Sequence, residues 1–379
     1  MSFVSRISVY LWILAVLSLL FPRSAESNAL RFAEYQLQPL PAPSVSSTLR
    51  TEFIQETGGP QSVHSGTLTQ LRDGTMLAAW FGGTREGAKD VNIYLSRRQS
   101  DAAEWSAPTV IASRAQTSAD LNRYVSKLGN PVLFADSRER VWLYYVTVSF
   151  GGWSGSSISV RYSDDGGDSW SAATRLTTSP FLNVSTLVKG LPLECESGHI
   201  LLPVYHEFVR KFGEALILDV DGQLVSKVRT TASDGAIQPW IVPLDPVRSQ
   251  AFYRQSGYTE KVVITSVLPD ILHSSSGALE PTTVPNPNSS VAVIRRDNGG
   301  FLMVCNPTEA GRNQLTILTS EDGKSWKTAR GIEHSTESGE FSYPYLLRGT
   351  DGQYHLIYTW NRSRMRYMSF DEQWLEDMP

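Results

Sequence analysis

The chain has 379 residues, of which 41% are hydrophobic and 19% are charged, a composition typical of a globular protein with a large core. Its net charge of −4 argues against a nucleic-acid-binding surface and against a polybasic membrane surface. The 10 Trp, 15 Tyr and 14 Phe suit β-sheets. They also suit sugar binding, because the C–H faces of sugars pack on aromatic rings.

The first 27 residues have the organisation of a secretory signal peptide. Arg6 precedes an uncharged apolar run at residues 7–21, and small residues suited to cleavage follow near Ser27. The run is short for a bilayer span, so an uncleaved anchor is the alternative. We expect residues 28–379 to form a single domain outside the cytoplasm, in a secreted or periplasmic protein.

Six copies of one hairpin pattern follow, each with a short apolar strand, a tight turn and a second strand. They cover residues 67–80, 130–145, 191–205, 236–254, 289–305 and 342–360. Repeats of similar length with several strands each are typical of a propeller, because each blade buries its faces against its neighbours. The sequence predicts an all-β, six-bladed β-propeller of four-stranded antiparallel blades. We expect a strand within residues 45–55 to close the ring.

Two near copies of a turn motif lie between strand-like runs. They read SDDGGDSW at residues 163–170 and SEDGKSW at residues 320–326, and a shorter version at residues 100–108 keeps Ser, Asp and Trp. Asp and Ser side chains can bond nearby backbone N–H groups, and glycine accepts a positive φ. The tryptophan can then cover the turn. We therefore predict a structural role for these acidic residues and place the active site elsewhere.

No metal or cofactor motif is present in the sequence. The six histidines lack metal-ligand spacing, and neither an EF-hand loop nor a nucleotide-binding glycine loop occurs. Cys195 and Cys305 are far apart and outside any metal-ligand pattern, so we predict buried thiols and leave a disulfide open. We expect no cofactor.

The turn motifs match the Asp-box, Ser-x-Asp-x-Gly-x-Ser/Thr-Trp. With six predicted blades and a secretory leader, the chain resembles the sialidase superfamily, and within it the bacterial BNR-repeat sialidase-like proteins. The resemblance covers residues 45–367. It implies an exported glycoside hydrolase that acts on terminal, acidic sugars of glycans through a central anion-binding pocket.

The resemblance also implies a set of site residues. The matches are Tyr343 for the catalytic nucleophile, Arg254 and Arg312 for carboxylate binding, Arg85 and Asp90 for a strand-end arginine and the general acid/base, and Glu86 as a competing acid. Sialic acid has a carboxylate on its anomeric carbon, which would repel a carboxylate nucleophile, so a tyrosine replaces it. Arginines hold the substrate carboxylate with charge-assisted hydrogen bonds.

Two positions depart from the family pattern. His64 stands where the first triad arginine is expected, and Gln238 stands where a glutamate draws the proton from the tyrosine. A glutamine cannot accept that proton, so the mechanism needs another base. Glu207 is the best candidate, and His206 is the second.

Further candidates come from their places in the repeats. Arg85, Arg254 and Arg312 follow apolar strands at the same phase, so we expect them to converge on one face of the central channel. Tyr205 belongs with His206 and Glu207 in a polar cluster after a strand. Trp360 and Arg362 form a candidate sugar platform, and His64 a candidate pocket residue. Asn130, Asn286 and Asn306 are interpreted as turn residues.

Two alternatives to a sialidase-type hydrolase stay open. One is a non-catalytic glycan-binding propeller, which His64 and Gln238 favour. The other is a hydrolase or lyase for another acidic sugar that uses Glu207 and His206. In each case we expect a monomer whose partner is a glycan or a sugar acid, and contact with a membrane only through an uncleaved leader.

Overall fold

The computed structural model describes residues 30–37, 48–55, 59–179, 183–231, 233–257, 260–271 and 277–377. The chain divides into a unit of residues 1–30 and a unit of residues 31–379, and all the strands belong to the second unit. The predicted leader, residues 1–27, lies outside the described residues. Within the described residues, no helix combines the length and apolar character that a membrane span requires.

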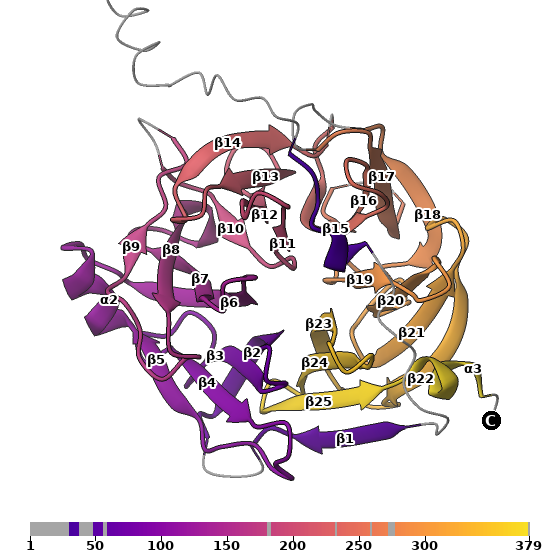
Figure 1. Ribbon diagram of the computed structural model, residues 1–379, viewed down its shortest axis with the longest axis horizontal. Coiled ribbons are helices and arrows are strands. Elements are labelled where there is room, and N and C mark those ends of the chain that lie inside the picture. Colours follow the sequence, from indigo (N-terminus) through magenta and orange to yellow (C-terminus); the bar gives the residue numbers. More distant parts are fainter. Residues whose placement is uncertain are drawn as a thin grey trace, which may run out of the picture. The chain divides into compact units, whose positions relative to one another are not determined.

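The described residues form six antiparallel sheets, which are the six blades of a β-propeller (Figure 1). Blades 1 to 3 contain β2 (Ser62–Gln70), β3 (Met76–Gly83), β4 (Asn92–Arg98) and β5 (Thr109–Ser113); β6 (Lys127–Ala135), β7 (Val141–Val148), β8 (Ser156–Ser163) and β9 (Thr174–Arg175); and β10 (Leu187–Val188), β11 (Leu193–Glu194), β12 (Ile200–His206), β13 (Phe212–Leu218) and β14 (Leu224–Arg229). In blade 3, β10 and β11 both pair with β12, so its innermost strand is interrupted.

Blades 4 to 6 repeat the arrangement. They contain β15 (Ala236–Pro243), β16 (Ser249–Gln255), β17 (Val262–Leu268) and β18 (Glu280–Pro285); β19 (Ala292–Arg295), β20 (Phe301–Cys305), β21 (Gln314–Ser320) and β22 (Lys327–His334); and β23 (Phe341–Arg348), β24 (Tyr354–Trp360), β25 (Arg364–Phe370) and β1 (Leu49–Phe53). β1 pairs with β25, with Leu49 opposite Phe370, and so closes the ring between the two ends of the chain. The predicted fold and the predicted closing strand are both confirmed.

The helices of the described residues are short. They are η1 (Glu34–Gln36), α2 (Arg114–Asp120), η2 (Trp153–Gly155) and α3 (Glu372–Glu376). α2 lies between blades 1 and 2, η2 lies between two strands of blade 2, and η1 and α3 lie before the first strand and after the last. Ser113 caps α2 by accepting a hydrogen bond from the backbone N–H of Gln116, and Asp371 caps α3 through the N–H of Trp374. They do not take part in the centre of the ring.

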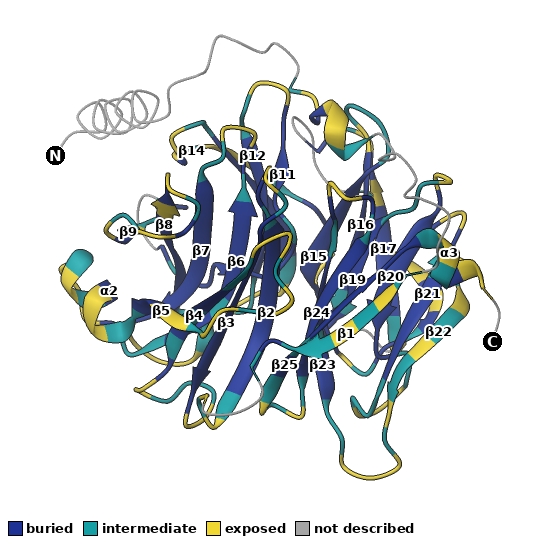
Figure 2. Ribbon diagram, turned by 60° about the horizontal axis from the view of Figure 1, so that its bottom comes forward, coloured by how far each residue is buried: buried dark blue, intermediate teal, exposed yellow. Residues whose placement is uncertain are grey.

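The core lies between neighbouring blades. All eight residues of β7 and of β15 are buried, whereas the outermost strands β14 and β22 are largely exposed or half-buried (Figure 2). One apolar cluster joins blades 4, 5, 6 and 1, and two smaller clusters join blades 1 to 4. Because each buried Val, Leu, Ile or Phe contributes about 1.5–3 kcal/mol, inter-blade packing is the main source of stability.

One backbone feature recurs on the inner side of every blade. A residue other than glycine adopts a positive φ at Ser65, Asn130, Ser185, Gln238, Asn288 and Tyr343, with φ between 39° and 63°. In β2, β6, β15 and β23 this residue lies in a β-bulge that shifts the pairing with the next strand. Bulges re-aim side chains, and left-handed residues of this kind gather at functional sites. The six positions therefore mark one end of the ring as the candidate site.

The Asp-box turns lie at the opposite end. In the first copy, Ser169 donates from its backbone N–H and its hydroxyl to Asp165, and Trp170 Nε1 donates to the Gly167 carbonyl at 3.2 Å. The second copy repeats these contacts around Asp322. Each turn follows the third strand of its blade, and antiparallel pairing places it away from the bulges. Their predicted structural role is confirmed.

A short N-terminal segment also docks at the Asp-box end. The backbone N–H of Phe32 donates to the carbonyl of Pro246 at 2.9 Å, and Phe32 forms an isolated bridge with Cys195. The ring of Phe32 is fully buried, and the Tyr35 hydroxyl donates to Glu194 at 2.8 Å. The segment therefore joins the inner turns of blades 3 and 4. Cys195 and Cys305 are free and buried, as predicted.

Candidate functional site

The centre of the bulge end is occupied by Tyr343, the left-handed residue of β23. Its ring is half-buried, and its hydroxyl oxygen accepts two hydrogen bonds, from Arg254 Nη1 at 3.2 Å and from Gln238 Nε2 at 3.3 Å. Both donors come from blade 4, which blade 5 separates from the blade of β23. Two donors directed at one phenolic oxygen stabilise negative charge that develops on it.

Gln238 connects Tyr343 to a second tyrosine. Its Nε2 also donates to the hydroxyl of Tyr205 at 3.2 Å, and Asn130 Nδ2 donates to the same hydroxyl at 3.2 Å. Tyr205 is buried, and burial, followed by the proximity of Tyr343 and Glu207, raises its pKa well above the ordinary value. Tyr205 therefore stays a neutral phenol, and its oxygen fixes the amide of Gln238 in the orientation that donates to Tyr343.

Three guanidinium groups surround Tyr343. Arg254 Nε donates to Asn288 Oδ1 at 2.7 Å, and the guanidinium carbon of Arg312 lies 5.8 Å from the centroid of the Tyr343 ring. Arg362 comes from the turn between β24 and β25 and donates to Glu86 at 2.7 Å and to Glu340 at 2.9 Å.

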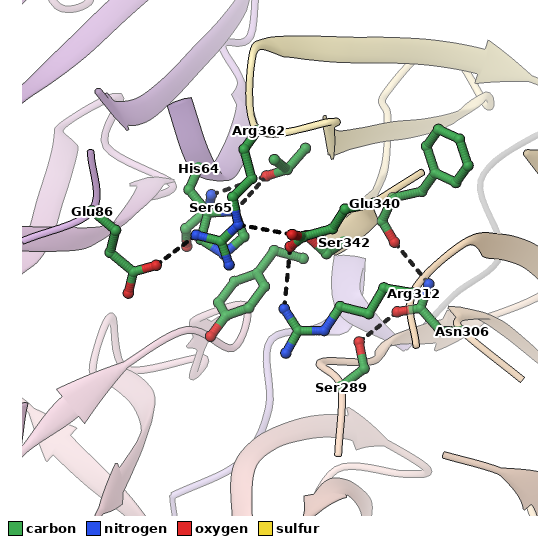
Figure 3. Close-up of polar contacts among 12 residues, drawn as sticks. His64, Ser65, Glu86, Ser289, Asn306, Arg312, Glu340, Ser342 and Arg362 are labelled. Carbon is green, nitrogen blue, oxygen red and sulfur yellow. Dashed lines mark hydrogen bonds and ion pairs between the residues drawn. The ribbon is translucent and has the colours of Figure 1, made fainter. Parts of the chain in front are cut away.

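Glu340 joins two of these arginines. It accepts from Arg362, from Arg312 at 3.4 Å and from the Ser342 hydroxyl at 2.8 Å. Figure 3 shows Arg362 between Glu86 and Glu340, with Arg312 on the other side of Glu340. Burial raises the pKa of Glu340, but the bonds from Arg362 and Ser342 outweigh it and lower the pKa overall. Arg254, in contrast, makes its hydrogen bonds with neutral groups in the described part of the chain.

His64 and Lys189 support the Tyr343 ring. The imidazole of His64 lies 4.2 Å from the ring of Tyr343, centroid to centroid, and its Nδ1 is 3.0 Å from Thr359 Oγ1. Burial, followed by the charges of Arg362 and Arg312, lowers the pKa of His64 well below its usual value, so it is neutral. His64 therefore cannot supply the charge of the missing arginine. Arg362 brings a third guanidinium to this side of the site.

Of the predicted polar cluster Tyr205, His206 and Glu207, the last two differ in their relation to the site. Glu207 is half-buried, and its charge raises the pKa of both Tyr205 and Arg254, although other causes are larger for each. It therefore lies within electrostatic reach of the site. His206 lies 3.0 Å from Glu214 Oε2 through its Nε2 and stacks on Phe212, so its ring is held by its own hairpin.

Three predicted site residues lie away from this group. Arg85 and Asp90 are exposed, and Asp90 accepts from the backbone N–H and hydroxyl of Thr84 at 2.9 and 3.0 Å, which closes the turn after β3. Of the acids in this turn, Glu86 is the one that reaches the central arginines. Trp360 packs against Phe53 and beneath Arg364 in blade 6. Arg254 and Arg312 converge as expected, whereas Arg85 does not join them.

The asparagines differ from one another. Asn286 bonds to the backbone of Ser289, three positions later, in agreement with the predicted turn role. Asn306 bonds to the Ser289 hydroxyl and to the carbonyl of Phe341 in the next blade, so it connects strands and is not a turn residue. Asn130 points its amide at Tyr205. Sequence reasoning missed Lys189, Asn288, Glu340 and Ser342. The six left-handed positions recur every 50 to 65 residues, so an alignment of the six predicted repeats was the signal that could have identified Asn288.

A pocket of about 410 Å³ borders the arginine cluster. It is lined by Ser335, Glu337, Ser338, Gly339, Glu340, Asn361 and Arg362. The side chains that line this pocket are polar, and Asn361 and Arg362 among them belong to blade 6. Among the described residues, no group of three or more His, Cys, Asp or Glu side chains is placed to hold a metal ion.

The fold and this site define a sialidase-like, six-bladed β-propeller. A family model, the BNR repeat-like domain, matches residues 74–356, which is well over half of the chain. The chain therefore belongs to the BNR repeat-like family. No curated protein matches the sequence.

Solved structures show the same fold at low sequence identity. A Hadza microbial sialidase is similar over 85% of this chain and 68% of its own, with a TM-score of 0.69 and 14% identity. The intramolecular trans-sialidase from Ruminococcus gnavus, in complex with oseltamivir carboxylate, is similar over 84% of this chain and 96% of its own, with a TM-score of 0.66 and 14% identity. The NanB sialidase from Streptococcus pneumoniae is similar over 85% and 70%, with a TM-score of 0.68 and 12% identity.

Proposed function

We propose that the protein is an exported glycoside hydrolase that binds a terminal, acidic sugar of a glycan over Tyr343. One observation supports this most directly. A half-buried tyrosine at a strained bulge accepts hydrogen bonds from an arginine and an amide of another blade, and guanidinium groups surround it. Such a tyrosine suits a sugar whose own carboxylate would repel an acidic nucleophile.

The arginines provide the basis for recognition of the acid. Arg254 has no carboxylate hydrogen-bonded to it within the described residues, so it is the strongest candidate to anchor an incoming carboxylate. Arg312 shares Glu340 with Arg362 and keeps donors available, since its one bond to Glu340 is 3.4 Å long. The Ruminococcus gnavus neighbour was solved with a carboxylate ligand, which agrees with this class of ligand for the fold.

The proposed reaction is a double displacement with retention. The Tyr343 oxygen forms a bond to the anomeric carbon as the glycosidic C–O bond breaks. The leaving oxygen takes a proton from the protonated form of Glu86, held on the carboxyl oxygen that Arg362 does not bind. The phenolic proton passes to Glu207, directly or through water. Water then attacks the same carbon and gives up a proton to the Glu86 carboxylate. The bond to the Tyr343 oxygen breaks, and Glu207 returns its proton to that oxygen. Gln238 and Arg254 hold the phenolic oxygen throughout.

Turnover of aryl glycosides tests this proposal. The purified protein should release the aryl group from sialosides or uronides, and Tyr343→Phe should abolish release while keeping affinity for the free sugar acid. Glu207→Gln should reduce turnover without removing it. If Glu207→Gln abolishes release and Tyr343→Phe does not, the enzyme belongs to the alternative class in which Glu207 replaces the tyrosine. No release and no binding of any acidic sugar would refute the proposal.

A non-catalytic glycan-binding propeller is the second candidate, and Gln238 favours it. Its amide donates to Tyr343 where a proton acceptor would activate the nucleophile. In that case the protein would bind acidic glycans on an array without releasing sugar. Tyr343→Phe would then change the affinity little, whereas Arg254→Met would abolish binding.

Export and a monomeric state belong to the same proposal. The N-terminal residue of the mature protein, determined by mass spectrometry on material from the growth medium or periplasm, should lie near position 28. An intact N-terminus in the membrane fraction would identify an anchor instead. Size-exclusion chromatography with light scattering should give the mass of one chain.

A further inference from the structure

Lys189 is a buried amine in the wall of the site, directly after β10. Its side chain is 1% exposed, and its Nζ lies 5.5 Å from the ring centroid of Tyr343 and 5.0 Å from that of Tyr345. The polar contact made by Nζ is with the carbonyl of Gly66 at 3.4 Å, a long hydrogen bond. Lys189 therefore lies between the inner strands of blades 1, 3 and 6, against the ring of Tyr343.

The surroundings of Lys189 do not neutralise a positive charge. Burial alone lowers the pKa of Lys189 to about 7, and no carboxylate of the described residues raises it. The titratable groups that face it are Tyr343 and Tyr345 on β23 and His64 on β2, whose pKa Lys189 itself helps to lower. Arg254, Arg312 and Arg362 act on the same histidine.

The fold does not require an amine at this place. A methionine has nearly the same length and would pack against two tyrosine rings without the desolvation of a charge. Lysine is therefore the less stable choice here. A side chain that lowers stability and contacts the central residue of a site indicates a functional role.

We propose that Lys189 is a positioning residue for Tyr343. Its side chain packs against the face of the Tyr343 ring, and its amine gains a proton when the phenol loses one. The phenolic proton goes to Glu207 in the proposed reaction, or to solvent in the free protein. Lys189 takes up a proton from solvent, so the net charge of the Tyr343–Lys189 pair is unchanged. An ammonium group over an aromatic ring is attractive, and it becomes more so when the ring is a phenolate. This inference extends the proposed function, on which it rests for the importance of Tyr343.

The test compares phenolate formation in matched variants. Ultraviolet difference spectra recorded from neutral to alkaline pH report tyrosine ionisation, and the component that disappears in Tyr343→Phe belongs to Tyr343. In Lys189→Met we expect this component to move to higher pH by about one unit, because the variant has no amine that can take up a proton and stabilise the phenolate. Lys327→Met, on the exposed outer strand β22, is the control and should leave it in place.

The outcomes separate this inference from the proposed function. An unchanged Tyr343 component in a folded Lys189→Met protein, or the absence of a distinct Tyr343 component, overturns the role of Lys189. Lys189→Gln, which keeps a polar group without charge, replaces Lys189→Met if circular dichroism shows that the latter is unfolded. A shifted component in a protein that cleaves no glycoside supports the Lys189 pair and refutes the hydrolase. Turnover of a glycoside with an unshifted Tyr343 component supports the hydrolase and refutes the role of Lys189.

Discussion

Gln238 and Tyr343 lie on the inner strands of blades 4 and 6, both with a left-handed backbone, and the amide of one donates to the phenolic oxygen of the other at 3.3 Å. The pair thus joins two blades that blade 5 separates. In the family that the chain resembles, a glutamate holds the place of Gln238 and withdraws the proton of the tyrosine. The chain thus keeps the geometry of that pair with the opposite hydrogen-bond direction.

Gln238→Glu is therefore predicted to increase glycoside turnover. The new carboxylate would accept from Tyr343 and Tyr205, and a positioned general base contributes typically about 10²–10⁴-fold. We expect a gain of about 10²-fold in kcat/KM for the best aryl glycoside. Gln223→Glu, in an exposed turn between β13 and β14, is the matched control. Equal turnover in the Gln238→Glu, control and wild-type proteins would show that the missing base does not limit the reaction.

Glu86 and Asp90 lie in the same turn and give a matched pair of variants. Glu86 bonds to Arg362 at 2.7 Å, whereas Asp90 bonds to Thr84 at 2.9 Å and is exposed. Glu86→Gln should lower turnover of substrates with a sugar leaving group by about 10²-fold or more. The loss should be much smaller for an aryl leaving group that departs without a proton. Asp90→Asn should leave the turnover of both kinds of substrate close to wild type. A large loss in Asp90→Asn and a small one in Glu86→Gln would instead identify Asp90 as the general acid.

Ser163→Ala tests the separation between the two ends of the ring. The buried Ser163 hydroxyl accepts from the N–H of Gly167 at 2.7 Å and donates to Asp165 at 2.7 Å. Leaving these partners unpaired should lower the free energy of unfolding by about 1–2 kcal/mol, measured by urea denaturation. Sugar binding should not change, because the turn lies at the Asp-box end. Asp164→Ala, which removes an exposed ion pair with Arg140, should have the smaller effect on stability.

The sequence was sufficient to predict the blades, the closing strand and the Asp-box turns, because each depends on local patterns of apolar residues, glycine and aspartate. The site depends on contacts between residues far apart in the chain. Arg85 and Arg362 both follow a second strand, but the left-handed turn at Asn361 and Arg362 directs one guanidinium inward, while Arg85 lies in an exposed turn. No pattern in a single sequence distinguishes these two outcomes.

Lys189 could not be predicted as a site residue from the sequence, for the same reason. It follows an apolar pair of residues in an interrupted inner strand, and its sequence neighbourhood is not that of a site. Its importance arises from the rings of Tyr343 and Tyr345, more than 150 positions later, which cover it. Burial of this kind depends on the closed ring, so it becomes visible only when blades 3 and 6 are placed together.

Lys189→Met is predicted to stabilise the protein in a pH-dependent manner. The pKa of Lys189 falls from 10.5 to about 7 on folding, because burial disfavours the ammonium form. Between these pH values the unfolded chain binds the extra proton, so the free energy of unfolding of the wild type rises with pH across this window. A pKa that is lower by one corresponds to about 1.4 kcal/mol, so methionine should stabilise the fold by a few kcal/mol at pH 7 and below.

This advantage of Lys189→Met should shrink as the pH rises toward 10.5, because lysine is neutral in both states only above that pH. Urea denaturation of the two proteins from about pH 6 to about pH 9.5 measures the difference directly, and the ionisation of buried tyrosines cancels because both proteins contain them. A difference that is constant with pH would mean that Lys189 is charged to the same extent in the folded and unfolded protein. In that case its burial would not lower the affinity for a proton, and the physical basis for pairing it with Tyr343 would be removed.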